Sequence, residues 1–378
     1  MNTPANTPAD NDLADNQQML AESAIRYLER GYSDAVRAAS TAHAHGCEPA
    51  RWAEFAEFGW LALAIPVQDG GLGGSLVEVC VLAEQLGRGL VVEPFVAAGV
   101  LPGLLLSALP AGALRDSWLA STGCGAERLA FAPWEPQARH NTAAVATRAE
   151  FVDGGWTLNG AKGLAPGAAG ADAFVSCART GAGTLGLFLV GAQATGLTVE
   201  ARALYDGRHA ASLKFAGVTG AHLLTDGTDA EVLQLINYVM DRVAVVHGAE
   251  VVGTMAQSLD ITRDYLATRK QFGKAIAGNQ VIQHRLVDLF VEIEEARSLV
   301  RAAALSPTPR LAAAASAYIA HAARHVWEES IQLHGAIGMT EDYVIGRYVR
   351  RLALAASLYG DSHHHLERLA AQSLGDIE

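Results

Sequence analysis

Apolar residues follow a helical repeat through the first third of the chain. In "EPARWAEFAEFGWLALAIP" the apolar positions Trp52, Phe55, Phe58 and Leu61 recur every third residue, which is typical of one face of a helix. The pattern stops at a turn-rich break, "IPVQDGGLGGS", and resumes in "LVEVCVLAEQLGRGLVVEP". We therefore expect an N-terminal helical domain at residues 17–124, after a disordered polar tail at residues 1–16.

The middle of the chain changes to a strand pattern. "TAAVATRAEFVDGGWTLNGAK" alternates between polar and apolar residues and contains two turn signals, Gly154-Gly155 and Asn159-Gly160. Short β-rich runs follow at regular spacing, namely "ADAFVSCART", "TLGLFLVG", "GLTVEARAL" and "ASLKFAGV". This texture predicts a small antiparallel β-barrel or sandwich at residues 125–225.

Helical periodicity returns at residues 226–378. Long apolar repeats follow one another with short links, which predicts an up-and-down four-helix bundle. The predicted fold class is therefore mostly α with a central β domain, placed between an N-terminal helical domain and a C-terminal bundle.

Composition narrows the function. The net charge of −12 argues against nucleic-acid binding, which needs clustered Lys and Arg. The four cysteines are widely spaced without a C-x-x-C pair, so we expect no zinc site, no disulfide scaffold and a reducing, cytoplasmic location. The start lacks the apolar core of a secretory signal, and the most apolar stretch, "FVAAGVLPGLLLSALP", is too short to span a bilayer.

Three glycine-containing stretches could carry chemistry. "GAGTLG" matches a dinucleotide fingerprint, but the strand-like "LFLVG" follows it where a helix is required, so we interpret it as a hairpin loop. "TRKQFGKAI" places cations at the end of a long helix, which on local grounds is equally well an ordinary helix stop. "IQLHGAIGMTED" is either a bundle turn or a place where the backbone approaches a ligand closely.

Taken together, the last two stretches resemble the acyl-CoA dehydrogenase family. "FGWLALAIPVQDGGLGGSLVEVCVLAEQLGRGLVVEP" is similar to that family's N-terminal helical domain, and "TLNGAKGLAPGAAGADAFVSCART" to its β domain. The resemblance covers nearly the whole chain in the right order. The closest texture is that of the small subunits of bacterial pimeloyl-CoA-type and steroid side-chain dehydrogenases, which work beside a larger partner.

The resemblance implies a mechanism and a cofactor. In such enzymes a carboxylate removes the proton next to the thioester carbonyl, FAD accepts a hydride from the neighbouring carbon, and a 2-enoyl-CoA is formed. FAD lies across a subunit interface in this family, which implies an oligomer. The positions that match its FAD-contacting motifs are Arg269, Gln271, Phe272, Gln332, Leu333, Gly335 and Ala336.

Two departures from the family concern the flavin. Where the family's β domain has an acidic stretch that contacts the flavin, this chain reads "FAPWEPQARHN", of which only Glu135-Pro136 is similar. After "LNGAK" the family places a tryptophan beside the flavin, and Leu164 stands there instead. We therefore hypothesise that this subunit completes a partner's flavin site and holds its own flavin weakly or not at all.

A third departure concerns the catalytic base. Many members carry it in a Tyr-Glu-Gly-Thr run, which here reads Tyr359-Gly360-Asp361-Ser362, so the glutamate position is Gly360. A second family location falls at Val243. The neighbouring acidic or basic side chains are weak candidates for the base: Asp361, Asp241, Glu250 and His247. Glu250 and Asp241 are more often solvated or ion-paired helix positions than bases. His247 and Glu250 share the helix face of Val243, whereas Asp241 points elsewhere.

The function predicted is that of a subunit of a flavin-dependent acyl-CoA dehydrogenase acting on a bulky or dicarboxylic acyl group, such as a steroid side chain. A larger subunit in a heterotetramer would supply the base, and electron-transfer flavoprotein is an open candidate for the acceptor. A self-sufficient homo-oligomer with a displaced base and a non-catalytic structural partner remain alternatives. The run His363-His364-His365 is interpreted as polar faces of a final helix capped by Asp361 or Ser362, and no metal is expected.

Overall fold

The chain divides into two compact units built from interleaved stretches. The computed structural model describes residues 8–271, 273–340 and 343–375. Unit 1 comprises Met1–Arg37, Ser75–Val91 and Val245–Glu378, and unit 2 comprises Ala38–Gly74 and Val92–Ala244. The three consecutive domains expected from the sequence describe the order of helices and strands, while each compact unit combines distant stretches.

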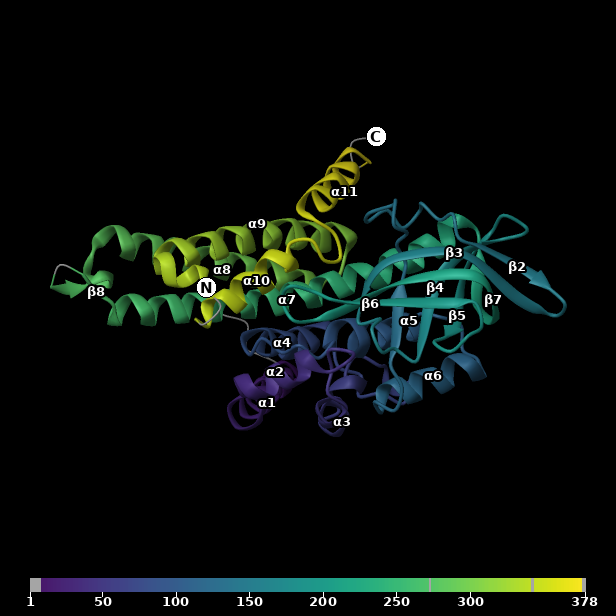
Figure 1. The fold of residues 1–378 in the computed structure, drawn as a ribbon, viewed down its shortest axis with the longest axis horizontal. Helices are drawn as coiled ribbons and strands as arrows, with labels where there is room; N and C mark the ends of the chain where they lie inside the picture. Colours follow the sequence, from purple (N-terminus) through teal and green to yellow (C-terminus); the bar gives the residue numbers. More distant parts are fainter. Residues whose placement is uncertain (1–7, 272, 341–342, 376–378) are drawn as a thin grey trace. The chain divides into compact units, whose positions relative to one another are not determined.

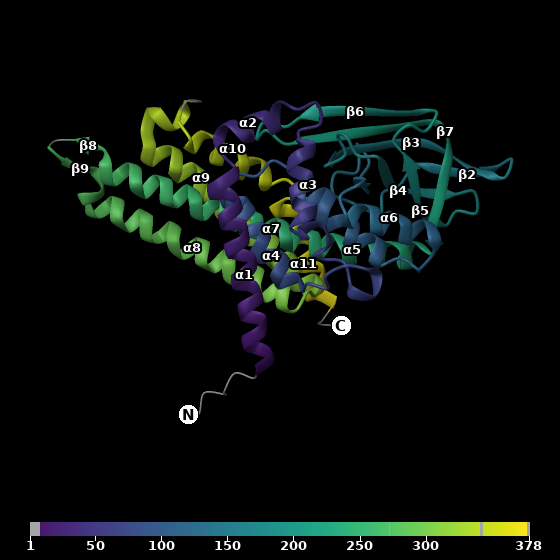
Figure 2. The ribbon, with the colours of Figure 1, turned by 90° about the horizontal axis from the view of Figure 1, so that it is seen from below.

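Unit 1 is helical. The 40-residue helix α7 (Asp229–Thr268) starts in unit 2 and ends in unit 1, and α2 (Asp34–Ala42) also crosses the boundary. Helices α8 and α9 lie side by side, and α10 and α11 pack against α9 (Figures 1 and 2). The remaining elements of unit 1 are α1 (Pro8–Gly31), α4 (Leu76–Arg88), β8 (Lys270–Gln271), β9 (Lys274–Ala275), η4 (Ile276–Gly278), α8 (Gln280–Leu305), α9 (Pro309–His334), η5 (Gly335–Met339), α10 (Ile345–Ala355) and α11 (Ser362–Gly375).

The predicted N-terminal tail is too long. Helix α1 begins at Pro8, so residues 8–16 are helical and that part of the tail prediction at residues 1–16 is wrong. Proline at a first helical position and aspartates in the following turns suit a helix start, although the segment lacks an apolar stripe. Residues 1–7 lie outside the described residues.

Helices α4 and α7 cross within unit 1 at two glycines, Gly87 and Gly253, where the two backbones lie too close together for a side chain. A Cβ at Gly253 would lie 1.8 Å from the Glu84 carbonyl oxygen, and one at Gly87 would lie 2.0 Å from the Glu250 carbonyl oxygen. The Thr254 hydroxyl bridges the crossing by donating to the carbonyl oxygens of Gly87 and Glu250. Only glycine allows two backbones to approach so closely, so these two positions fix the packing of α4 on α7.

Unit 2 combines short helices with a β-sheet. Its helical elements are α3 (Pro49–Glu57), η1 (Trp60–Ala62), η2 (Val67–Asp69), the π-helical turn η3 (Phe95–Val100), α5 (Leu101–Ser107) and α6 (Ala113–Gly123). Its strands are β1 (Leu129–Ala132), β2 (Arg148–Val152), β3 (Gly155–Pro166), β4 (Ala173–Thr180), β5 (Leu185–Gly191), β6 (Leu197–Ala203) and β7 (His209–Gly227) (Figure 1). Within the described residues, no helix has both the length and the apolar character needed to cross a bilayer.

The sheet closes on itself around an apolar core. Strand order runs β1-β4-β2-β3-β7-β5, β5 also pairs with β4, and β6 pairs with β7. The core contains Leu158, Phe174, Phe188, Leu213 and Phe215. Most neighbours are antiparallel, as predicted, but β1 and β2 both run parallel to β4, which the sequence pattern did not indicate. The segment "GAGTLG" lies in the antiparallel β4–β5 hairpin, so its interpretation as a hairpin loop is confirmed.

Candidate FAD-contacting ends and the catalytic-base position

The first predicted cofactor stretch lies where α7 ends. The Arg269 backbone N–H donates to the Tyr265 carbonyl oxygen at 2.8 Å, and the Arg269 carbonyl oxygen accepts from Ile276 N–H at 2.9 Å across the β8–β9 hairpin. Arg269 and Gln271 are exposed. Toward the described residues, the Arg269 guanidinium forms no hydrogen bond or ion pair. Phe272 lies outside the described residues.

The second predicted stretch lies where α9 ends. Gln332 and Ala336 are exposed, and Leu333 is buried. Gly335 has φ +65° and ψ −143°, a backbone conformation that is essentially restricted to glycine. The α9 terminus therefore ends in a turn that a side-chain-bearing residue would strain.

Tyr265 and His334 join these two stretches. Their rings stack with centroids 4.5 Å apart at 23°, and the Tyr265 hydroxyl donates to the His334 carbonyl oxygen at 3.3 Å. His334 Nδ1 lies 2.8 Å from the Ser330 carbonyl oxygen, and its buried Nε2 has no hydrogen-bond partner among the described residues. Burial lowers the pKa of His334, against the effect of its hydrogen bond to Ser330. Sequence reasoning missed Tyr265, although an aromatic residue one helical turn before Arg269 was a visible signal.

The residues at these ends fit the diphosphate of FAD. An exposed arginine offers a fixed charge and a bidentate fork, and an exposed glutamine offers amide donors. The glycine turn removes a side chain where a backbone would approach a ligand. The buried Nε2 of His334, which has no hydrogen-bond partner among the described residues, is a further polar atom at the same helix end. Arg269, Gln271 and Gln332 thus form a donor set suited to an anionic cofactor, beside the turn at Gly335 and Ala336, which lacks large side chains.

Gly360 occupies the glutamate position with a backbone adapted to glycine. Its φ is +117°, and the preceding Tyr359 also has a positive φ of +57°. A Cβ at Gly360 would lie 2.3 Å from His365 Nε2 and 2.9 Å from His364 Cδ2. A glutamate at this position would therefore strain the backbone and require the His365 and His364 rings to shift.

Glu250, one of the candidate bases, is buried in an ion-paired network. Its carboxylate accepts from Arg351 Nη1 at 2.9 Å and lies 3.1 Å from His247 Nδ1. His247 Nε2 lies 3.3 Å from the Ala355 carbonyl oxygen, and its ring packs against Tyr359 with centroids 5.1 Å apart. The carboxylate is therefore held in place by a buried guanidinium. This geometry favours a structural role for Glu250.

The other candidates lie at a helix cap and on the unit 2 part of α7. Asp361 Oδ1 accepts from the His364 backbone N–H at 2.8 Å, so Asp361 caps the N-terminus of α11. Of the two caps predicted from the sequence, Asp361 and Ser362, the first is the one observed. Asp241 and Val243 are buried on the part of α7 that belongs to unit 2. His363 is exposed and pairs with Glu367, whereas His365 is buried. Within the described part of the chain, no cluster of three or more His, Cys, Asp or Glu side chains could hold a metal ion.

Glu135 and Lys162 form a buried ion pair in unit 2. Their atoms Oε1 and Nζ are 3.0 Å apart, and Glu135 also accepts from the backbone N–H groups of Ala146 and Thr147 and from the Thr147 hydroxyl. Burial raises the pKa of Glu135, but the hydrogen bonds from Thr147 and the charge of Lys162 outweigh it and lower the pKa to about 2. Leu164 is exposed. Glu135 therefore supports the fold of the sheet.

Comparisons with known proteins agree with this architecture. The family model described as "Acyl-CoA dehydrogenase, N-terminal domain" matches residues 14–121, and "Acyl-CoA dehydrogenase, C-terminal domain" matches residues 233–374, which together span more than half of the chain. The chain belongs to the acyl-CoA dehydrogenase family, whose members are oxidoreductases acting on CH–CH bonds. The predicted fold class is confirmed, and the predicted cofactor, FAD, is confirmed at the level of the family.

Similar proteins cover almost the whole chain. Acyl-CoA dehydrogenase IpdE2 of Mycolicibacterium smegmatis is 27% identical over 95% of this chain and 99% of its own length. Benzylmalonyl-CoA dehydrogenase of Aromatoleum aromaticum is 29% identical over 90% of this chain and 93% of its own length. A solved variant of the Tcur3481-Tcur3483 steroid ACAD is 27% identical with a TM-score of 0.87, covering 97% of this chain and 100% of that chain. A glutaryl-CoA dehydrogenase from Mycobacterium smegmatis in complex with FADH2 shares the fold at 19% identity and a TM-score of 0.83, covering 95% of each chain.

Proposed function

We propose that this chain is the base-lacking subunit of a cytoplasmic FAD-dependent acyl-CoA dehydrogenase that converts an acyl-CoA thioester to a 2-enoyl-CoA. The observation that carries the proposal is Gly360, where the family's glutamate is absent and where a positive φ and the nearby His365 ring disfavour any side chain. The nearby acidic groups Glu250 and Asp361 are engaged in an ion pair and a helix cap. A larger partner subunit would therefore supply the carboxylate that removes the α-proton.

The chain's own contribution is to bind and orient the cofactor. FAD, when bound, supplies the hydride acceptor that no side chain can provide. Arg269 would hold the diphosphate as a fixed cation, while Gln271, Gln332 and the turn at Gly335 would offer polar contacts without a side-chain obstruction. The stacked pair Tyr265 and His334 would keep the two helix ends in register.

Relatives support a bulky or dicarboxylic acyl group. One is named for benzylmalonyl-CoA, and the solved Tcur3481-Tcur3483 relative is described as a steroid ACAD. A steroid side chain or an aromatic dicarboxylate attached to coenzyme A is therefore the substrate class we propose. An electron-transfer flavoprotein is the acceptor to test first.

An exposed apolar face on α8 supports assembly with a partner. Val287, Phe290 and Val291 are 58%, 54% and 46% exposed. Spaced three and four residues apart, they share one helix face. Large apolar side chains clustered on a surface mark interaction sites more often than isolated ones do. The name of the Tcur3481-Tcur3483 relative, which joins two components, is consistent with a heteromeric assembly.

Flavin retention tests the proposed cofactor role. We expect Arg269→Gln to weaken FAD binding by roughly 10- to 100-fold, because a charge-assisted hydrogen bond contributes about 1.5–3 kcal/mol. The matched control is Lys270→Gln, the adjacent exposed cation, which should retain wild-type flavin content. Flavin absorbance per protomer is measured after desalting the assembled protein. Equal retention in both variants would overturn the assignment of Arg269.

Two alternatives make different predictions. A self-sufficient enzyme with a displaced base would use Asp361, which is only partly buried and next to Gly360. Its activity without a partner should then disappear in Asp361→Asn. A purely structural subunit would assemble with its partner but leave flavin content unchanged when Arg269 is replaced.

A further inference from the structure

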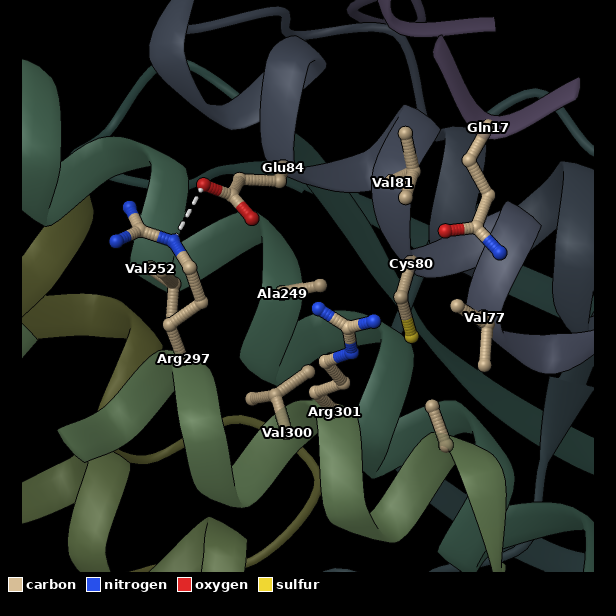
Figure 3. A pocket seen from close by; sticks show the side chains of 11 residues that line it. Gln17, Val77, Cys80, Val81, Glu84, Ala249, Val252, Arg297, Val300 and Arg301 are labelled. Atoms are coloured by element: carbon tan, nitrogen blue, oxygen red, sulfur yellow. Dashed lines mark hydrogen bonds and ion pairs between the residues drawn. The ribbon is translucent and has the colours of Figure 1, made fainter. Parts of the chain in front are cut away.

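Unit 1 contains a cavity between helices α1, α4, α7 and α8. Its volume is about 170 Å3, and Figure 3 shows the side chains that line it. The lining is contributed by Gln17 of α1, by Val77, Cys80, Val81 and Glu84 of α4, by Ala249 and Val252 of α7, and by Arg297, Val300, Arg301 and Ala304 of α8. None of these residues belongs to the cofactor stretches, and nothing in the proposed reaction uses them.

The walls of this cavity are apolar. Valine and alanine side chains come from three helices, and Cys80 is a buried thiol whose pKa is raised by burial, so it stays neutral. The cavity volume is close to the roughly 150 Å3 of an apolar protein cavity that accommodates benzene. The space therefore suits a hydrocarbon body of about six carbons.

The polar groups at the rim are not equivalent. Arg297 already pairs with two carboxylates, because its Nε donates to Glu84 Oε1 at 3.0 Å and its Nη1 pairs with Glu294. Arg301 forms no hydrogen bond or ion pair with any described residue. Figure 3 shows its guanidinium extending over the cavity toward Ala249 and Cys80, with the Glu84–Arg297 pair on one side and the Gln17 amide on the other. Arg301 is also exposed, so a solvated cation with no protein partner among the described residues stands at the mouth of an apolar space.

We infer that this cavity binds a small organic carboxylate with an apolar body of about six carbons. The planar guanidinium of Arg301 matches a carboxylate through two parallel hydrogen bonds. The Gln17 amide offers a further donor, and the hydrocarbon body lies against the valines of α4 and α8. Inorganic phosphate lacks the apolar body for these walls, and a neutral alcohol lacks the charge for Arg301, so the carboxylate uses both features of the cavity.

Hexanoate is a direct probe of this site in the full-length protein. We expect hexanoate to bind and to raise the melting temperature, since a ligand that binds the folded state stabilises it. 1-Hexanol should bind at least about tenfold more weakly, because its neutral hydroxyl can accept at most one hydrogen bond at a time in place of a bidentate ion pair with Arg301. Inorganic phosphate should give no melting shift. Equal binding of 1-hexanol and hexanoate, or no binding of hexanoate at millimolar concentration, would overturn the inference.

Two variants locate the binding on the residues named. Arg301→Gln should weaken hexanoate binding by roughly tenfold or more, whereas Arg324→Gln, which removes an exposed arginine of α9, should not change it. Ala304→Leu should fill the cavity and block hexanoate while leaving far-ultraviolet circular dichroism unchanged. Undiminished binding in Arg301→Gln or in folded Ala304→Leu would place the ligand elsewhere. These outcomes do not depend on FAD or on a partner subunit.

Discussion

The Arg351 guanidinium lies 2.9 Å from the Glu250 carboxylate, and both side chains are buried. Arg351 also donates from Nη2 to the Val91 carbonyl oxygen at 3.0 Å, so it joins α10 to α7 and to the segment after α4. A buried ion pair is retained at the cost of desolvation, but removing one partner leaves an uncompensated charge. The pair therefore makes Glu250 part of the framework that supports the Tyr359–Gly360 turn.

Replacing Arg351 with methionine should destabilise unit 1 strongly. The volume is nearly kept, but the Glu250 carboxylate loses its cation inside the protein, and we expect a cost of about 3–5 kcal/mol. The measurement is the free energy of unfolding from urea denaturation. Arg324→Met, at an exposed i,i+4 pair with Glu328, should cost at most about 0.5 kcal/mol. Equal costs for the two variants would contradict the network.

Introducing glutamate at position 360 should not restore a catalytic base. The substitution places a side chain at φ +117° and against His365, so Gly360→Glu should lower the melting temperature without raising enoyl-CoA formation by the isolated chain. In a His365→Ala background the destabilisation should be partly relieved, which a double-mutant cycle measures. Ser357→Glu, at a nearby exposed position, is the control for added charge. A stable and active Gly360→Glu chain would refute the steric argument.

The Glu135–Lys162 pair predicts a specific pH dependence. The pKa of Glu135 is lowered to about 2 in the folded protein, from a usual 4.5, so the carboxylate contributes stability above the usual value and loses that contribution as pH falls toward 2. Lys162→Met should cost about 3 kcal/mol at neutral pH. This cost should shrink on acidification, because a protonated Glu135 needs no cation.

Chemical denaturation of the Lys162→Met variant between neutral pH and about pH 3 checks that trend. Lys214→Met, at an exposed position of β7, should leave the stability–pH curve unchanged. A Lys162→Met cost that stayed constant across the range would show that the pair does not determine the charge state of Glu135.

The apolar face of α8 should be needed for assembly. Phe290→Glu places a charge among Val287, Phe290 and Val291 and should shift the purified protein toward smaller species in light scattering. Phe151→Glu, at an equally exposed phenylalanine of β2, is the matched control and should leave the mass unchanged. If only Phe151→Glu dissociates the assembly, the interface lies elsewhere.

The order of helices and strands was predictable, because the periodic spacing of apolar residues is a local property of the chain. Helical repeats around Phe55 and the alternation around Trp156 both correspond to observed elements. Strand partners were harder to predict: the β-rich run "ADAFVSCART" indicates the strand β4 but not its parallel neighbours β1 and β2. The start of α1 was missed because its first turns have no apolar stripe.

The candidate site was predictable only in part. The family stretches located Arg269 and Gln332, and helical spacing placed His247 and Glu250 on one face of α7. The ion pair with Arg351, 101 residues away, could not be inferred, since no local pattern reports contacts between distant helices. The same holds for the stacking of Tyr265 on His334.

Enoyl-CoA formation by the purified chain, with and without its larger partner subunit, tests the central claim most directly. A panel of acyl-CoA thioesters with bulky and dicarboxylic acyl groups is assayed with an artificial electron acceptor. The account predicts no product from the chain by itself and turnover once the larger subunit is added, unaffected by Asp361→Asn in this chain. Turnover by the isolated chain that Asp361→Asn abolishes would contradict it.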